Sequence, residues 1–114
     1  RFHHIPPYTG VCEIGGRSYV SSFSSRAKAE RAIAHALVAN QASIKQWLSN
    51  SSRENFPLNH KYGRSVGLSV SKTDGSVART NFLRVVLMKD QKLPEGYRIQ
   101  TAYPIRKGQA EDGP

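Results

Sequence analysis

The chain of 114 residues has little cysteine, little acidic charge and no long apolar run. Its single cysteine, Cys12, excludes an intramolecular disulfide and a zinc site made of several cysteines. No apolar run approaches the roughly 18 residues of a membrane-spanning helix, and no signal peptide is present. The first residue is Arg1 rather than Met. We therefore expect one domain over residues 1–114, the C-terminal part of a longer chain whose N-terminal elements are missing.

Acidic residues are scarce and scattered, which argues against a metal-dependent nuclease, because such enzymes need clustered carboxylates. Lysine and arginine number 17 against 8 aspartates and glutamates, a net charge of +9. This excess of positive charge attracts anions, and nucleic acid is the commonest anionic partner of basic proteins. The chain also has no Gly-rich phosphate loop, no Gly-x-Ser-x-Gly elbow and no His-Glu-x-x-His motif. The remaining chemistry is that of histidine, arginine, lysine and hydroxyl groups, with no metal and no cofactor.

The N-terminal half predicts an irregular arm, a short strand and then a helical region. Residues 1–16 show no clear hydrophobic period and contain turn-forming Pro and Gly. Residues 17–23 read as a strand. The Ser24-Ser25 pair can cap the helical region over residues 26–48, because a serine oxygen accepts an otherwise unpaired backbone N–H.

Within the helical region, apolar residues recur at three- and four-residue spacings and form one stripe. These residues are Ala29, Ile33, Ala36, Leu37, Ile44, Trp47 and Leu48. Asn40 and Gln41 interrupt the stripe, so we expect two helices with a break near Asn40. Trp47 continues the stripe and is expected to anchor the core, whereas His35 is expected on a solvated face.

The C-terminal half predicts antiparallel strands. Residues 49–61 are polar and read as a loop. Residues 64–72 and 77–88 read as strands joined at Asp74-Gly75, a pair typical of type I′ hairpin turns. The last strand is residues 97–104. The sequence therefore predicts an α+β fold, in which an N-terminal helical half packs on a curved antiparallel β-meander of about three strands.

The last strand carries a candidate phosphate site. Strict alternation predicts that Tyr97, Ile99, Thr101 and Tyr103 share one face, with Thr101 and Tyr103 roughly 7 Å apart. Two hydroxyls on a rigid strand beside cationic side chains can hold a phosphate. The alternative is an ordinary half-buried strand with an aromatic cap.

These side chains suit metal-independent RNA cleavage. A histidine would deprotonate the ribose 2′-OH, which then attacks the adjacent phosphorus, and a second acid would protonate the leaving 5′-oxygen. Cationic and hydroxyl groups would stabilise the pentacoordinate phosphorane. His3 and His4 are the candidate acid and base, because an unperturbed histidine titrates between pH 5 and 8. Their alternative is plain solvation near a chain end.

Several segments in a defined order resemble one known family. They are Tyr19-Val-Ser-Ser-Phe23, Ser25-Arg-Ala-Lys-Ala-Glu-Arg-Ala-Ile33, Ile44-Lys-Gln-Trp-Leu48 and Thr101-Ala-Tyr-Pro104. Over residues 17 to 105 the chain resembles the bacterial RNase A-like toxin domains at the C-terminal tips of contact-dependent inhibition and other polymorphic toxins. The resemblance implies an RNase A-like α+β domain without disulfides, and it carries the family's active-site Thr and Tyr to Thr101 and Tyr103.

The resemblance also implies partners and a place of action. RNA is the expected substrate, and a cognate, acidic immunity protein is the expected inhibitor. We expect a monomer or a toxin–immunity heterodimer that is secreted or delivered from the cell surface and acts in the cytoplasm of the target bacterium. A domain that needs no disulfide can act in that reducing compartment.

The N-terminus departs from the family pattern, which has a Lys/Arg-His-Val-Gly helix and, later, an Arg followed by an apolar residue. No His-Val-Gly occurs here. Either Arg1-Phe2 is the remnant of the later pair and the family histidine lay upstream, or His3 or His4 substitutes for it. Arg1 or Arg17 would then be the phosphate-binding arginine. We predict that Arg17 acts in catalysis together with His3, His4, Thr101 and Tyr103.

Further cationic residues are predicted to bind RNA phosphates. They are His60, Lys61, Arg64 and Arg98. Plain solvent exposure is the alternative for His60 and Lys61, which fall in the predicted loop.

A second interpretation is a non-catalytic, ribosome-associated RNA-binding module. Its basic residues would be Arg64, Lys72, Arg79, Arg84, Arg98, Arg106 and Lys107. Such charge supplies salt-dependent affinity without catalysis. A DNase is disfavoured, because most DNases need metal ligands that the sequence lacks.

Overall fold

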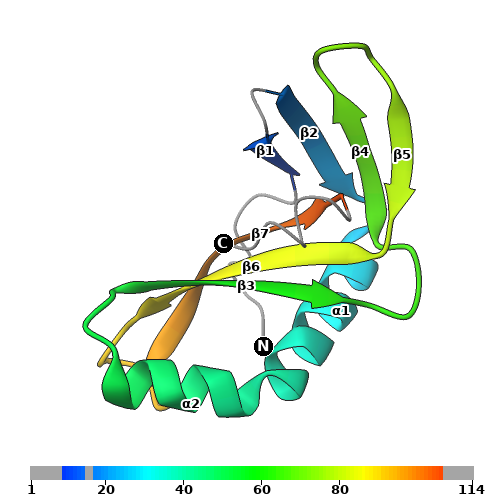
Figure 1. The fold of residues 1–114 in the computed structure, drawn as a ribbon. Coiled ribbons are helices and arrows are strands. Elements are labelled where there is room, and N and C mark those ends of the chain that lie inside the picture. Colours follow the sequence, from blue (N-terminus) through cyan, green and yellow to red (C-terminus); the bar gives the residue numbers. More distant parts are fainter. Residues whose placement is uncertain (1–8, 15–16, 107–114) are drawn as a thin grey trace.

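The computed structural model describes residues 9–14 and 17–106, which form two helices and seven strands. In chain order these are β1 (Thr9–Ile14), β2 (Arg17–Phe23), α1 (Arg26–Ala39), α2 (Gln41–Asn50), β3 (Asn55–Lys61), β4 (Gly67–Ser71), β5 (Val77–Thr80), β6 (Phe82–Lys89) and β7 (Tyr97–Ile105). The predicted α+β class is confirmed (Figure 1).

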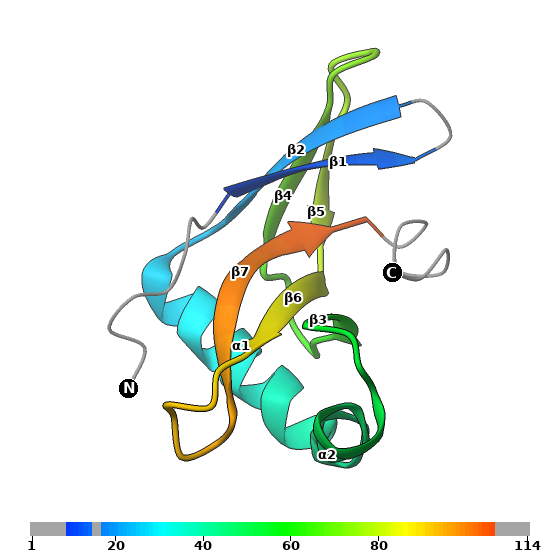
Figure 2. The same cartoon turned by 90° about the vertical axis from the view of Figure 1, so that its left-hand side faces the viewer.

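The strands form two antiparallel sheets. The first sheet has the order β1-β2-β4-β5, and the second has the order β3-β6-β7. The end of β7 contacts β1, β2 and β4, so the sheets meet there. Figures 1 and 2 show the first sheet rising away from the second, while the two helices run beneath the second sheet.

Two side chains tie the sheets together. The chain passes from the first sheet to the second between Thr80 and Phe82, and the Thr80 hydroxyl donates to the carbonyl of Ile105 at 2.5 Å. At the end of β7, Arg106 donates to the Ser69 hydroxyl and carbonyl, each at 3.1 Å. Ser69 is fully buried. These bonds fix where β7 abuts the first sheet.

The helices begin and break where the sequence predicts. The Ser25 hydroxyl accepts the backbone N–H of Lys28 at 3.1 Å, which caps α1. Asn40 separates the helices, and its side chain donates to the carbonyl of Ala36 at 2.8 Å. Neither helix of the described segments is long and apolar enough to cross a membrane.

The core lies between the helices and one face of the second sheet. The helices contribute Ala29, Ala32, Ile33, Ala36, Ile44 and Trp47, and the sheet contributes Leu58, Leu83, Val85, Leu87 and Ala102. Trp47 is only 5% exposed, so its predicted role as a core anchor is confirmed. The other face of the second sheet carries no helix, and we call it the open face.

Three parts of the strand prediction are wrong. The irregular arm contains β1, and the loop predicted over residues 49–61 contains β3. Pro57 and the nearby asparagines made residues 55–61 read as a loop. However, β3 is an edge strand, and an edge strand tolerates proline where the missing N–H would face solvent. Residues 77–88 form not one strand but β5 and β6, which lie in different sheets.

The hairpin predicted at Asp74-Gly75 joins β4 to β5, but its turn is not type I′. In the described part of the chain only Gly75 and Gly96 have positive φ, whereas a type I′ turn needs positive φ at both central residues. The Asp74 carboxylate instead accepts the backbone N–H of Ser76 at 2.9 Å, and the Ser71 N–H donates to the Ser76 carbonyl at 2.9 Å. A longer, side-chain-supported turn results.

Candidate functional site

A β-bulge in β7 decides which side chains reach the open face. Thr101 pairs with Val86, whereas Ile99 pairs with the next residue of β6, Leu87, so Gln100 is extra. Leu87 is buried in the core, so Ile99 faces the helices. Adjacent strand residues point to opposite faces, and Thr101 therefore lies on the open face.

The prediction that Tyr97, Ile99, Thr101 and Tyr103 share a face is consequently wrong. Strict alternation fails at the bulge, which sends the first two toward the core. Thr101 and Tyr103 stay together on the open face, two residues apart in the uninterrupted part of the strand. Both are half-buried.

Arg84 lies beside this pair, at the centre of a cross-strand row. It pairs with Asn59 of β3 on one side and with Tyr103 of β7 on the other. The Arg84 Nε donates to the Asn59 Oδ1 at 2.8 Å, which fixes the direction of the guanidinium. A cation, a phenol and an alcohol thus share one face of neighbouring strands, and such groups can stabilise a phosphate or a phosphorane.

Sequence reasoning assigned no role to Asn59, and it named Arg84 only as a basic residue of the alternative RNA-binding module. The signal for Arg84 was its place between Leu83 and Val85 in an apolar strand, which forces its side chain away from the core. Asn59 carried no such signal, because its segment read as a loop.

Other predicted phosphate ligands are spread over the surface. Lys61 ends β3 on the side of Asn59 and is exposed, and Arg64 is exposed in the following loop. Arg98 pairs with Met88, so it also lies on the open face, beyond the bulge. Its guanidinium contacts the Met88 sulfur at 2.9 Å and lies 3.8 Å from the Asp90 carboxylate.

His60 lies on the opposite side of the sheet from Thr101. It pairs with the buried Leu83, so its ring faces the helices, and its Nε2 shares a 2.8 Å hydrogen bond with the Nδ1 of His35. Tyr62 meets the His35 ring edge-on, with 5.4 Å between ring centroids. His35 is exposed, so its predicted place on a solvated helix face is confirmed, but its ring also hydrogen-bonds to His60.

Asn40 orients this histidine pair. Its Nδ2 donates to the Ala36 carbonyl at 2.8 Å and lies 3.4 Å from His60 Nδ1. The amide therefore presents a donor to Nδ1, which makes His60 Nε2 the protonated nitrogen that donates to His35. Burial, followed by the charge of His35, lowers the pKa of His60 from 6.5. No group of three or more His, Cys, Asp or Glu side chains that could hold a metal ion occurs in residues 9–14 and 17–106.

The remaining predicted site residues are located only in part. Arg1, His3 and His4 lie outside the described residues. Arg17 is placed by its backbone at the start of β2, where it pairs with Ile14 of β1. The assignment of acid, base and N-terminal arginine stays a prediction.

Residues 13–104 match the family described as the bacterial CdiA-CT RNAse A domain. The chain belongs to this family. The resemblance noted in the sequence is thereby confirmed, and the chain is a ribonuclease-type toxin domain of contact-dependent inhibition. The matched segment includes Thr101 and Tyr103 and begins after His3 and His4.

A solved structure supports membership of the CdiA-CT RNAse A family. A chain in the crystal structure of a CdiA-CT/CdiI complex from Y. kristensenii is 32% identical to this one, with a TM-score of 0.74. The match covers 76% of this chain and 77% of that chain. No curated protein matches the chain.

Proposed function

We propose that this CdiA-CT RNAse A domain cleaves RNA without a metal ion, with its reaction centre on the open face of the second sheet. The observation that carries the proposal is the adjacency of Arg84, Tyr103 and Thr101 inside the segment that matches the ribonuclease family. The ribose 2′-oxygen attacks the neighbouring phosphorus, the bond to the 5′-oxygen breaks, and the products are a 2′,3′-cyclic phosphate and a 5′-hydroxyl.

The three side chains would stabilise the phosphorane. Its non-bridging oxygens carry more negative charge than those of the substrate, so fixed donors bind them more strongly than the ground state. The Arg84 guanidinium, oriented by Asn59, supplies a cation. The hydroxyls of Thr101 and Tyr103 donate hydrogen bonds without needing to ionise.

The acid and base are assigned to the N-terminal segment. His3 or His4 would remove the 2′-proton, and a second acid would protonate the leaving 5′-oxygen. Arg1 or Arg17 would bind the phosphate. His35 and His60 are not assigned to the reaction, because the His60 ring lies on the helix side of the sheet. Lys61, Arg64 and Arg98 would bind phosphates on either side of the cleaved bond.

The biological role we infer is that of a toxin in interbacterial competition. Contact-dependent inhibition would deliver the single domain into the cytoplasm of a target bacterium, where RNA is the substrate. The similar Y. kristensenii chain belongs to a CdiA-CT/CdiI complex, and the net charge of +9 suits an acidic immunity partner. The domain would act as a monomer and be neutralised as a heterodimer.

The deciding experiment is incubation of the purified domain with total RNA in EDTA, followed by analysis of the product ends. We expect cleavage that leaves 2′,3′-cyclic phosphates. Cleavage only after a divalent metal is added would refute the metal-free mechanism. Intact RNA with tight, salt-sensitive binding would favour the non-catalytic RNA-binding module, and adding native upstream sequence would then test whether a histidine before Arg1 is required.

A further inference from the structure

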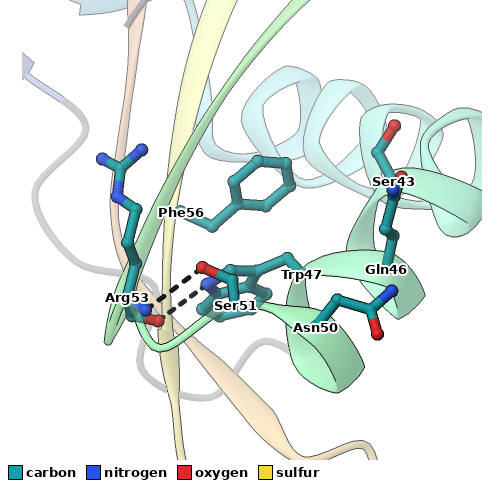
Figure 3. Close-up of a pocket in the computed structure, with 7 residues that line it drawn as sticks. All are labelled: Ser43, Gln46, Trp47, Asn50, Ser51, Arg53 and Phe56. Atoms are coloured by element: carbon teal, nitrogen blue, oxygen red, sulfur yellow. Dashed lines mark hydrogen bonds between the residues drawn. The ribbon is translucent and has the colours of Figure 1, made fainter.

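A pocket of about 420 Å³ lies between α2 and the start of β3, away from the cross-strand row on the open face (Figure 3). It is lined by Ser43, Gln46, Trp47, Asn50, Ser51, Arg53 and Phe56. Its volume falls in the range of small-molecule sites, which combine apolar or aromatic walls with a few polar groups. The proposed reaction does not use it.

One wall of the pocket is a stripe on α2. Ser43, Gln46, Trp47 and Asn50 follow one another at spacings of three, one and three residues, which places them on one helix face. Gln46 and Asn50 are exposed, and neither side-chain amide makes a hydrogen bond within the described residues. Each amide offers both a donor and an acceptor, as the edges of nucleobases do.

The aromatic part of the pocket is a stacked pair. The Trp47 and Phe56 rings have centroids 5.3 Å apart and an interplanar angle of 23°. Two contacts fix the Trp47 ring: its Nε1 donates to the Arg53 carbonyl at 2.9 Å, and Lys89 Nζ lies 5.7 Å from the ring centroid. Phe56, which is only partly buried, is therefore the ring available for stacking in the pocket.

The charge of the pocket suits a nucleic acid. No carboxylate lines it, and its single charged lining residue is Arg53, a cation whose side chain extends away from Gln46 and Asn50 (Figure 3). The Arg53 backbone N–H donates to the Ser51 hydroxyl at 3.1 Å, which fixes the turn that carries this arginine.

The pocket lies on the helix side of edge strand β3, whereas Thr101 lies on the open face, so RNA that reaches both must pass around this edge. Pro57, the neighbour of Phe56, belongs to the cross-strand row Pro57–Val86–Thr101. Two strand spacings separate the ends of this row, about 10 Å. Between them, Asn55 donates to Gln100 of the bulge at 2.7 Å. This row covers the part of the RNA path that crosses β6 on the open face, and the RNA would then turn over the edge strand β3 into the pocket.

We propose that this pocket binds one nucleobase of a single-stranded RNA substrate, beyond the two nucleotides that flank the phosphate held at Thr101. The base stacks on Phe56 and the edge of the base bonds with Gln46 and Asn50, while Arg53 binds the adjoining phosphate. The inference rests on the proposed ribonuclease function.

Trp47 provides a direct readout, because it is the chain's single tryptophan. The probe is a five-nucleotide 2′-O-methyl RNA, which cannot be cleaved because its 2′-oxygen is blocked. We expect saturable quenching of Trp47 fluorescence. The same oligonucleotide with abasic sites should bind about 5- to 150-fold more weakly, the equivalent of one lost base–aromatic stack, and should not quench. Equal quenching by both oligonucleotides would overturn the proposal.

The variants separate pocket contacts from folding. Gln46→Ala combined with Asn50→Ala removes exposed amides and should weaken binding of the base-bearing probe at least about fivefold, the size of one good base contact. Phe56→Leu keeps apolar burial but removes the stacking ring and should also weaken binding. The matched control is Gln91→Ala, an exposed amide in the β6–β7 turn. Unchanged binding in the double amide variant would refute the base subsite.

Cleavage assays keep this inference distinct from the proposed function. If the domain cleaves RNA, the double amide variant should raise KM for a five-nucleotide substrate and leave the cleavage of a dinucleotide unchanged. If the domain binds the probe in a base-dependent way but cleaves nothing, the ribonuclease proposal fails and the subsite stands. If the domain cleaves RNA but binds the probe whether or not the bases are present, the base subsite fails and the ribonuclease proposal stands.

Discussion

At the scale of single residues, the candidate site depends on how one neutral side chain directs one charged side chain. Asn59 accepts from the Nε of Arg84, and Arg84 lies opposite Tyr103 on the next strand. A guanidinium that is already oriented loses less conformational entropy when it binds a phosphate. Asn59 is thus a positioning residue, whereas Arg84, Thr101 and Tyr103 would touch the reacting group.

Removal of single hydroxyls tests this arrangement. Tyr103→Phe and Thr101→Ala should each lower kcat for RNA cleavage by about 10²-fold, the usual effect of losing one transition-state donor. Thermal unfolding should show that both variants stay folded. Unchanged cleavage rates in both variants would disprove the site assignment.

The histidine pair predicts a pH dependence of stability. The folded-state pKa of His60 is lowered below 6.5, because burial and the charge of His35 disfavour protonation. As pH falls through 6.5, the unfolded chain binds a proton that folded His60 does not, so the free energy of unfolding decreases. This loss stops once the pH is below the folded-state pKa.

Urea unfolding of the wild type and His60→Gln at pH 5.5 and pH 7.5 measures this contribution. We expect the loss of stability at the lower pH to be smaller in His60→Gln. His35→Gln should give an intermediate dependence, because it removes the charge but leaves the burial. An identical pH dependence in all three proteins would contradict the assignment.

At the scale of elements, the first sheet depends on one close approach between strands. Gly67 of β4 pairs with Phe23 of β2, and a Cβ added at Gly67 would lie 2.0 Å from the Ser22 carbonyl oxygen. That atom belongs to the backbone and cannot move aside alone. The glycine is therefore required for β2 and β4 to pair up to the start of α1.

Gly67→Ala should accordingly destabilise the protein by about 1–3 kcal/mol, the usual cost of overpacking. Gly63→Ala is the matched control, because a Cβ at Gly63 meets no atom within 4 Å. Urea unfolding measures both variants. Equal stabilities would show that the strands can separate at this point without cost.

At the scale of the whole molecule, the net charge of +9 should dominate the affinity for RNA. Each phosphate that the domain neutralises on a single strand contributes about −0.7 to the slope of log K against log salt concentration. Charges on the open face should contribute to this slope, and charges on the far side of the helices should not.

Salt titrations of the 2′-O-methyl RNA complex test that division. Arg84→Gln should make the slope shallower by about 0.7, the share of one phosphate contact. Arg26→Gln provides the comparison, because Arg26 begins α1 and lies 3.8 Å from Glu30 in an exposed ion pair. If both variants change the slope equally, binding is spread over the whole surface.

Local sequence patterns determined the elements whose stability is largely local. The helical period of the apolar stripe, the serine cap and Asn40 predicted α1, α2 and the break between them. Strand-like segments predicted β2, β4 and β7, and the segment order Tyr19–Phe23 to Thr101–Pro104 indicated the family. Alternation in the last strand also marked Thr101 and Tyr103 as candidates, because it predicts that both hydroxyls lie on one face.

The tertiary structure alone decided which side chains meet. β3 forms because β6 offers it a partner, despite its loop-like composition. The bulge at Gln100 turns Thr101 away from Ile99, and the register of three strands brings Asn59, Arg84 and Tyr103 into one row. His35 and His60 meet across 25 residues of chain. Strand pairing and register are set by contacts between distant segments, so a pattern read along the chain predicts a strand but not its neighbours.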